Sequence, residues 1–245
     1  MLAQRWAKGE PEIGLLPALC PSHLLAVDIG AHRGFYTWFL LRQTTRVVAF
    51  DPLPLMQRLL RQQYGDTISI QDVALSDRTG ECLLRFPADA AGLATISAKN
   101  RLQMSEDNIV AITVRSATLD SYEFANVGFI KIDVEGHEES VLRGASRTLM
   151  RDLPNLIVEI EERHAPGATV AVPALLQELG YDGYYLDGGQ ILDIAEFASD
   201  RDQPAANISG GEKIGRYINN FIFIRRDKAQ AMRRRLQRLI GAASP

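Results

Sequence analysis

Apolar and polar positions alternate along the chain in a pattern that predicts buried parallel strands separated by helices. The apolar runs at Leu24–Ile29 and Val127–Val134 are typical of strands covered on both faces. Further strands are expected at Arg46–Phe50, Thr67–Gln71 and Asn155–Ile160. Strands that recur at this spacing, with helix-length segments between them, favour right-handed βαβ units and one mostly parallel sheet.

Apolar residues at helical spacing fill most of the intervals between these strands. Phe35, Trp38 and Phe39 predict a helix directly after the first strand. The other expected helices are Leu53–Gln63 with Leu55, Leu59 and Leu60 inward, Glu138–Met150 with Val141, Leu142, Ala145 and Leu149 inward, and Val170–Leu179, closed by Gly180.

The middle of the chain departs from this alternation. Glu81–Phe86 and Ile109–Val114 are strand-like, but the segment between them, Pro87–Asp107, is mixed and polar, without helical periodicity. We interpret residues around 81–115 as an insertion made of two antiparallel strands and a mobile loop. Because long loops in compact domains are often lids, Pro87–Asp107 is the candidate substrate lid.

The last strands are expected at Tyr181–Leu186 and Asn220–Ile224, joined by a polar loop around Ala198–Gly215. A final amphipathic helix, Asp227–Ile240, places four apolar residues on one face and arginines on the rest. The chain is therefore divided into an N-terminal extension (residues 1–23), one α/β domain (24–226) and a basic C-terminal helix (227–245).

Composition narrows the class of protein. The 245 residues, 46% of them hydrophobic, suffice for one large domain, and no apolar run approaches the roughly 20 residues of a membrane-spanning helix. The N-terminus lacks the apolar stretch of a signal peptide. Cys20 and Cys82 are too few and too far apart for a disulfide framework, so a cytoplasmic location is expected.

The net charge of −3 hides an uneven distribution. Residues Arg225–Pro245 hold seven basic residues against one acidic residue, a net of +6, which leaves −9 for the rest of the chain. An acidic body argues against nucleic acid as a partner. The basic helix either packs its apolar stripe against the body or a second subunit, or lies on an anionic membrane surface.

Two segments near the first strands could bind a ligand. Asp28 to Gly34 (DIGAHRG) joins a buried strand to a helix, where glycines let a ligand approach the backbone. The dinucleotide fingerprint is excluded because His32 stands where a glycine is required, and this disfavours a dehydrogenase. Asp51 ends the second strand, where nucleotide-binding folds place a carboxylate that accepts ribose hydroxyls; a turn aspartate is the plainer alternative.

Two further clusters follow the later strands. Lys131 to Glu138 (KIDVEGHE) places four ionisable groups at a strand end, and strand periodicity predicts Lys131, Asp133 and Glu135 on one side. A buried lysine requires carboxylate partners. Glu159, Glu161, Glu162 and His164 after the next strand could ligate a cation, although solvated turn residues are the plainer reading of Glu162 and His164.

Together these segments resemble the FkbM family of S-adenosylmethionine-dependent methyltransferases. The resemblance runs from about Ala26 to Tyr185, and Asn219–Arg225 also fits. It rests on Val27–Gly34, Phe50–Pro52, Asp72–Ser76, Thr118–Asp120 and Ile130–Glu138, of which the KIDVEGHE segment is the most specific. Two positions depart from the family, which usually has Asn at His32 and Glu at Asp51.

The resemblance implies an α/β class I methyltransferase (Rossmann-like) fold: a seven-stranded, mostly parallel sheet with a reversed last strand and helices on both faces. It implies S-adenosylmethionine as cofactor and a hydroxyl of a sugar, glycan or polyketide-like natural product as acceptor. The implied cofactor residues are Asp28, Gly30 and Gly34 around the methionine part, His32 in the same loop, Asp51 at the ribose, Asp72 and Val73 at the adenine, and Asp133 at the active-site floor.

Methyl transfer to a hydroxyl requires alignment and removal of a proton. His137 is the preferred general base, because an imidazole accepts a proton near neutral pH, and Glu135 and Glu159 are candidates to orient it or the substrate. The alternatives are a metal-assisted methyltransferase, in which the acids hold a cation, and a non-catalytic module that only binds the cofactor.

Overall fold

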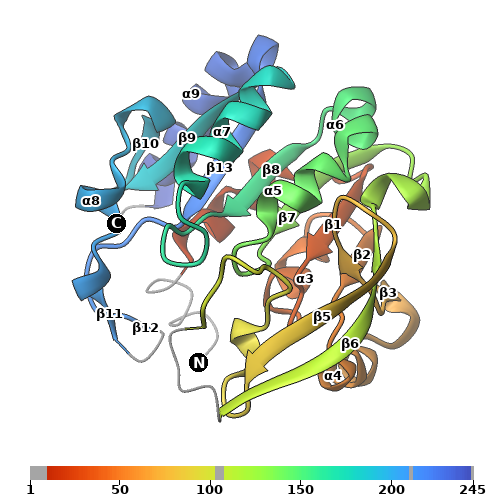
Figure 1. The fold of residues 1–245 in the computed structure, drawn as a ribbon. Helices are drawn as coiled ribbons and strands as arrows, with labels where there is room; N and C mark the ends of the chain where they lie inside the picture. Colours follow the sequence, from red (N-terminus) through yellow and green to blue (C-terminus); the bar gives the residue numbers. More distant parts are fainter. Residues whose placement is uncertain (1–9, 103–107, 210–211, 244–245) are drawn as a thin grey trace.

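The computed structural model describes residues 10–102, 108–209 and 212–243. Its centre is an eight-stranded sheet with the order β10-β9-β13-β8-β7-β1-β2-β3 (Figure 1). The strands are β1 Leu25–Ile29, β2 Val47–Phe50, β3 Ser69–Gln71, β7 Val127–Ile132, β8 Asn155–Glu159, β9 Tyr181–Asp187, β10 Gln190–Asp193 and β13 Asn220–Arg225. Each strand anticipated from the sequence is present, with ends shifted by one to three residues.

The strand directions match the expected pattern, with one addition. Strands β3, β2, β1, β7 and β8 pair in parallel, and β13 runs antiparallel between β8 and β9. The eighth strand, β10, forms an antiparallel hairpin with β9 through Gly188 and Gly189, both with positive φ. The expectation of seven strands was therefore one short, and the Gly-Gly pair is the hairpin signal that marks the additional strand.

Helices cover both faces of the sheet because successive strand residues face opposite sides. Helices α5, α6 and α7 pack on one face, and η1, α2, α3, α4 and α9 pack on the other (Figure 1). Their bounds are η1 Pro11–Leu15, α2 Leu16–Leu19, α3 Phe35–Leu40, α4 Pro54–Tyr64, α5 Glu138–Arg143, α6 Ser146–Asp152, α7 Ala168–Glu178, α8 Ser199–Asp202 and α9 Arg226–Ala243.

Two helical expectations are corrected. The single helix expected over Glu138–Met150 is divided into α5 and α6 at Gly144, where a Cβ would overlap the carbonyl oxygen of Ser76. The close approach of that neighbouring chain segment interrupts the helix, although the expected apolar face is buried throughout. In α4, Leu55 is 48% exposed and Met56 is buried instead, alongside Leu60.

The insertion forms a second, three-stranded sheet with the order β4-β6-β5. Strand β4 is Ala74–Leu75, and the long strands β5 (Gly80–Pro87) and β6 (Ile109–Ala117) pair antiparallel, as expected (Figure 1). Leu84 of β5 packs against Leu53 and Met56 at the start of α4. The expected lid contains the short helix η3 (Ala91–Leu93), and its residues 103–107 lie outside the described part of the chain.

The basic C-terminal helix α9 is integrated into the core. Ala229 and Leu236 are buried, and Met232, Leu239 and Ile240 pack partly buried against the same cluster. The apolar stripe therefore lies on the sheet of its own chain. Among the described residues, no helix is both long and apolar enough to cross a membrane.

Candidate active site

A hollow lies where β1, β2 and β7 end, at the carboxyl edge of the parallel strands. Its walls come from the turns after these strands, from Val73 to Leu75, and from the insertion, which contributes Ala91, Gly92, Ala94 and Ile96. It encloses about 720 Å³, including the part open to solvent. Open α/β sheets bind ligands at this edge.

The glycine-rich turn after β1 is shaped by backbone packing. Gly30 has φ +80°, and a Cβ there would overlap the carbonyl oxygen of Asp133, so the turns after β1 and β7 are in direct contact. Gly34, also at positive φ, begins α3 and lies against Tyr64. Gly30 lines the hollow, whereas Gly34 supports it from behind.

Asp51 joins the second turn to the first. Its buried carboxylate accepts the backbone N–H of His32 at 2.8 Å and that of Leu53 at 2.9 Å, and it also lines the hollow. Burial raises the pKa of Asp51 to about 6. His32 adopts φ +49° and its ring lies beside Gly92 of the insertion. The carboxylate thus fixes the turn and keeps lone pairs for a ligand.

Asp28 lies deeper than expected. It is 1% exposed and accepts a 2.5 Å hydrogen bond from the Thr37 hydroxyl, and burial raises its pKa to about 6. It lines a smaller adjoining hollow together with Glu10, Lys131 and Asp133 rather than the main one. Gly30, His32 and Asp133 line both spaces, so the site has a larger, mainly apolar part and a smaller acidic part.

Lys131 has the carboxylate partners that its burial requires. Its Nζ lies 3.7 Å from Asp133 Oδ2, 3.9 Å from Glu159 Oε2 and 3.2 Å from Asn220 Oδ1. Burial opposes the charge of Lys131, but these carboxylates outweigh it and raise the pKa of the amine. Burial and Asp133 raise the pKa of Glu159 well above its ordinary value. Glu159 does not line either hollow.

His137 lines the main hollow and is oriented by Ser76. Its Nε2 lies 2.9 Å from Ser76 Oγ, and the Ser76 hydroxyl donates to Asp77 Oδ1 at 3.1 Å. Because the single hydroxyl proton is directed to Asp77, Nε2 carries the imidazole proton and Nδ1 keeps its lone pair. Burial lowers the pKa of His137, which favours this neutral form.

Glu135 pairs with His164, not with His137. Strand β7 ends at Ile132 and Glu135 has φ +55°, so strand periodicity does not extend to it. Its Oε2 lies 2.8 Å from Nδ1 of His164, which is 7% exposed. Burial opposes protonation of His164, but Glu135 raises the pKa of the imidazole. Ser76 therefore lies against His137, while Glu135, which was expected together with Glu159 to orient either this ring or the substrate, pairs with His164.

The turn after β8 is also more ordered than a solvated loop. The Glu162 carboxylate accepts the backbone N–H groups of Gly167 and Thr169 at the start of α7. The interpretation as solvated turn residues is wrong for His164, which is a buried partner of Glu135, whereas Glu162 is a partly exposed turn residue that holds the start of a helix.

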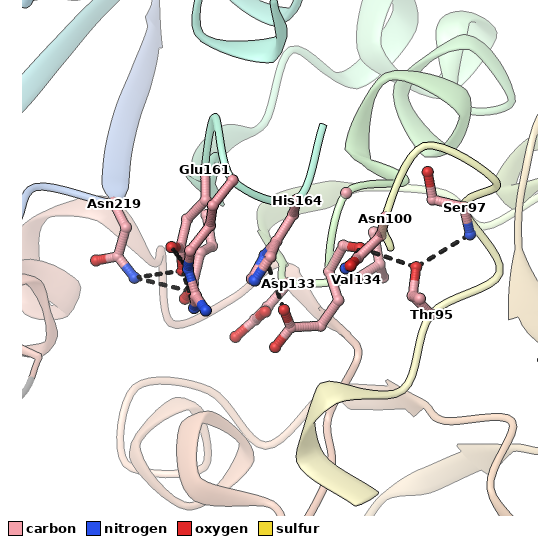
Figure 2. Close-up of polar contacts among 12 residues, drawn as sticks. Thr95, Ser97, Asn100, Asp133, Val134, Glu161, His164 and Asn219 are labelled. Carbon is pink, nitrogen blue, oxygen red and sulfur yellow. Dashed lines mark hydrogen bonds and ion pairs between the residues drawn. The ribbon is translucent and has the colours of Figure 1, made fainter. Parts of the chain in front are cut away.

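Two side chains of the insertion hold it against the active-site turn. The Thr95 hydroxyl and the Asn100 amide each donate to the backbone carbonyl of Glu135 at 2.8 Å. Figure 2 shows Thr95 and Asn100 on one side of Asp133 and His164, with Glu161 and Asn219 on the other. The insertion thus covers the carboxyl edge of the main sheet.

Similarity to known proteins identifies the family. Residues 28–183 match the model of the methyltransferase FkbM domain. The chain belongs to the FkbM methyltransferase family. Methyltransferase sdnD of Sordaria araneosa is 22% identical over 196 residues (66% of this chain, 75% of that one), and Methyltransferase 1 of Beauveria bassiana (strain ARSEF 2860) is 24% identical over 184 residues (66% and 73%).

A solved structure agrees with the fold of this FkbM-family chain. The crystal structure of methyltransferase FkbM from Methylobacillus flagellatus KT is similar with a TM-score of 0.53 and 17% identity, over 82% of this chain and 43% of that one. This chain thus spans less than half of that protein. The class I methyltransferase fold anticipated from the sequence is confirmed.

The FkbM motifs supply part of the site, and residues outside them supply the rest. Val73 is buried and lines the main hollow, but Asp72 pairs with Arg115 at the surface and does not line it. Sequence reasoning assigned no role to Ser76, Thr95 or Asn100, because their function depends on contacts across the fold. No group of three or more metal-binding side chains occurs among the described residues.

Proposed function

We propose that the chain is an S-adenosylmethionine-dependent O-methyltransferase that acts on a hydroxyl of a sugar, glycan or polyketide-like natural product. One observation carries the proposal. His137 lines a hollow at the carboxyl edge of the sheet, where burial lowers the pKa of its imidazole and Ser76 Oγ lies 2.9 Å from Nε2, which leaves Nδ1 for the acceptor. Family membership supplies the expectation of methyl transfer.

The two-part site fits the cofactor chemically. Apolar side chains such as Phe50, Val73 and Leu84 suit a nucleobase, and Asp51 suits ribose hydroxyls. The adjoining acidic space, with Asp28 and Asp133, suits a group that carries an amine and a positive sulfur. Gly30 and His32, which line both spaces, would hold the junction, while Gly34 and Asp72 would act from outside it.

The protein's own task is to position the acceptor and remove a proton. Asp51 in the larger part of the site and Asp28 with Asp133 in the acidic part would hold S-adenosylmethionine, which would supply the methyl group and leave as the neutral thioether S-adenosylhomocysteine. His137 Nδ1 takes the hydroxyl proton, and Ser76 keeps the ring oriented through Nε2. Glu135, which also lines the hollow, is placed to contact the acceptor.

Methyl transfer from radiolabelled S-adenosylmethionine tests the proposal. Wild-type protein is incubated with extract of the source organism and with a panel of sugars, glycans and hydroxylated polyketides, and the labelled product is identified. We expect His137→Gln to lower kcat by about 10²–10⁴-fold, the range of general base catalysis, with little change in S-adenosylhomocysteine affinity by calorimetry. Unimpaired turnover of His137→Gln would exclude it as the base, and failure to bind the cofactor would refute the function.

A further inference from the structure

A second hollow lies directly beside the cofactor hollow, on the other side of His137. Its walls are Ser97 to Lys99 of the insertion, Gly136 to Ser140 at the start of α5, and, at the start of α7, Ala165 to Ala168 with Ala171 and Val172. It encloses about 890 Å³, including the part open to solvent. His137 lines both hollows.

The two hollows are built from the same two chain segments in succession. In the insertion, the lining residues up to Ile96 face the cofactor hollow and those from Ser97 face the second one. In the turn after β7, Asp133 to Glu135 line the cofactor hollow and not the second one, and Gly136 lines the second hollow and not the cofactor hollow. His137 therefore lies at their boundary, next to a group that enters from the second hollow.

The walls of the second hollow differ in chemistry. The α7 wall is apolar and made of small side chains, among them Ala168, Ala171 and Val172. The opposite wall carries the Lys99 amine and the Glu139 carboxylate, which lie 3.9 Å apart, so their charges offset each other. Such a site suits an uncharged molecule with one apolar face and polar groups on the other.

Glu138, at the base of this hollow, is engaged by the backbone. Its carboxylate is 3% exposed and accepts the backbone N–H of Gly136 at 2.9 Å. The group thus holds the turn that carries Glu135 and His137, and it contributes shape to the hollow more than free charge.

We propose that this second hollow is the acceptor site, and that it takes an uncharged, hydroxylated ring compound whose apolar face lies on the alanines of α7. The hydroxyl to be methylated reaches the cofactor hollow past His137. This proposal rests on the proposed methyltransferase function and adds the place and the polarity of the acceptor.

A bulky side chain introduced on α7 would fill the second hollow, and it tests acceptor binding independently of cofactor binding. Ala171→Trp places an indole in the second hollow, and Val170→Trp, one residue away and 74% exposed, is the matched control. Ser140→Trp fills the hollow from the opposite wall and guards against a folding defect specific to α7. Circular dichroism and S-adenosylhomocysteine calorimetry establish that each variant is folded and binds cofactor.

Binding is measured by ligand-observed NMR with S-adenosylhomocysteine present, using methyl glycosides, cyclohexanediols and hydroxylated lactones as probes. We expect wild type and Val170→Trp to bind members of this set, and a folded Ala171→Trp or Ser140→Trp to lose at least ten-fold in affinity with cofactor affinity unchanged. Equal binding in the filled variants would overturn the location, and a wild type that binds none of the probes would overturn the ligand class. Loss of methyl transfer with intact probe binding would contradict only the proposed function.

Discussion

The orientation and the pKa of the His137 imidazole depend on residues that are far away in the sequence. The Ser76 hydroxyl, 61 positions earlier, fixes its Nε2, and burial lowers the pKa of the ring. A lowered pKa means that the imidazole remains neutral, and able to accept a proton, to a lower pH than a free histidine. The turn that presents it contains Glu135 in the left-handed region, a conformation that is uncommon for residues other than glycine.

The pH dependence of catalysis follows from this environment. We expect kcat/KM to fall on the acid side with a midpoint below 6.5, the ordinary value for histidine, because protonation of His137 removes the base. Steady-state rates at saturating S-adenosylmethionine from pH 5 to pH 9 measure the profile. The acid limb should disappear from the residual activity of His137→Gln; a midpoint above 6.5, or a limb that persists in the variant, would assign the titration to another group.

The loop after β8 contains buried polar contacts that local sequence patterns do not predict. Glu161 is 3% exposed and pairs with Arg163, while the Tyr217 hydroxyl donates to it at 2.7 Å. Burial alone would raise the pKa of Glu161, but Arg163 and His164 outweigh it and lower that pKa to about 2. These contacts join the end of β8 to the segment that precedes β13, so one carboxylate connects two neighbouring strands of the sheet.

Glu161→Gln should destabilise the fold at neutral pH. The pKa of the folded state lies below the ordinary value of 4.5, so the ionised carboxylate stabilises the fold above pH 4.5, and this contribution is lost as the pH falls towards 2. The difference between the two pKa values corresponds to a stabilisation of the folded state by roughly 3 kcal/mol at pH 7. Urea denaturation from pH 7 to pH 2.5 checks it, with Glu178→Gln, at an exposed position of α7, as the control. A difference in the free energy of unfolding between wild type and variant that stays constant over this pH range would contradict the prediction.

Elements with strong periodicity could be predicted from the sequence, and elements governed by distant contacts could not. The buried strands β1 and β7 follow from continuous apolar runs, because only a covered parallel strand accommodates such a run. The division between α5 and α6 depends on the Ser76 carbonyl beside Gly144, and no local signal reports that neighbour. For the same reason, Asp51 was found from its place after β2, while Ser76 was assigned no role.

Helix α9 closes one face of the whole molecule. From its arginines, this helix was predicted to be a basic tail separate from the α/β domain. In the structure, however, Leu236 is fully buried in the cluster formed with η1, α2 and α3. The acidic main part of the chain and its basic C-terminal helix therefore belong to one packed domain. A purely peripheral helix would leave uncovered the part of this face that α9 occupies.

We expect Leu236→Ala to destabilise the whole domain by about 2–5 kcal/mol, the range for a buried leucine. Leu239→Ala, three positions further and only partly buried, should lower the stability less. Thermal and urea unfolding provide the measurement, and S-adenosylhomocysteine calorimetry on the folded variants should show unchanged affinity, because neither residue lines the cofactor hollows. If Leu236→Ala unfolds like wild type, α9 does not belong to the cooperative core.

The hairpin of β5 and β6 has a consequence for how such proteins diversify. Its two strands start and finish side by side, with Gly80 opposite Ser116. The segment beyond them can therefore lengthen, shorten or be exchanged between relatives without any displacement of the main sheet. Because this one segment walls the cofactor hollow with residues up to Ile96 and the second hollow with Ser97 to Lys99, an exchange of the segment would remodel the walls of both hollows at once, while the strands of the main sheet stay unaltered.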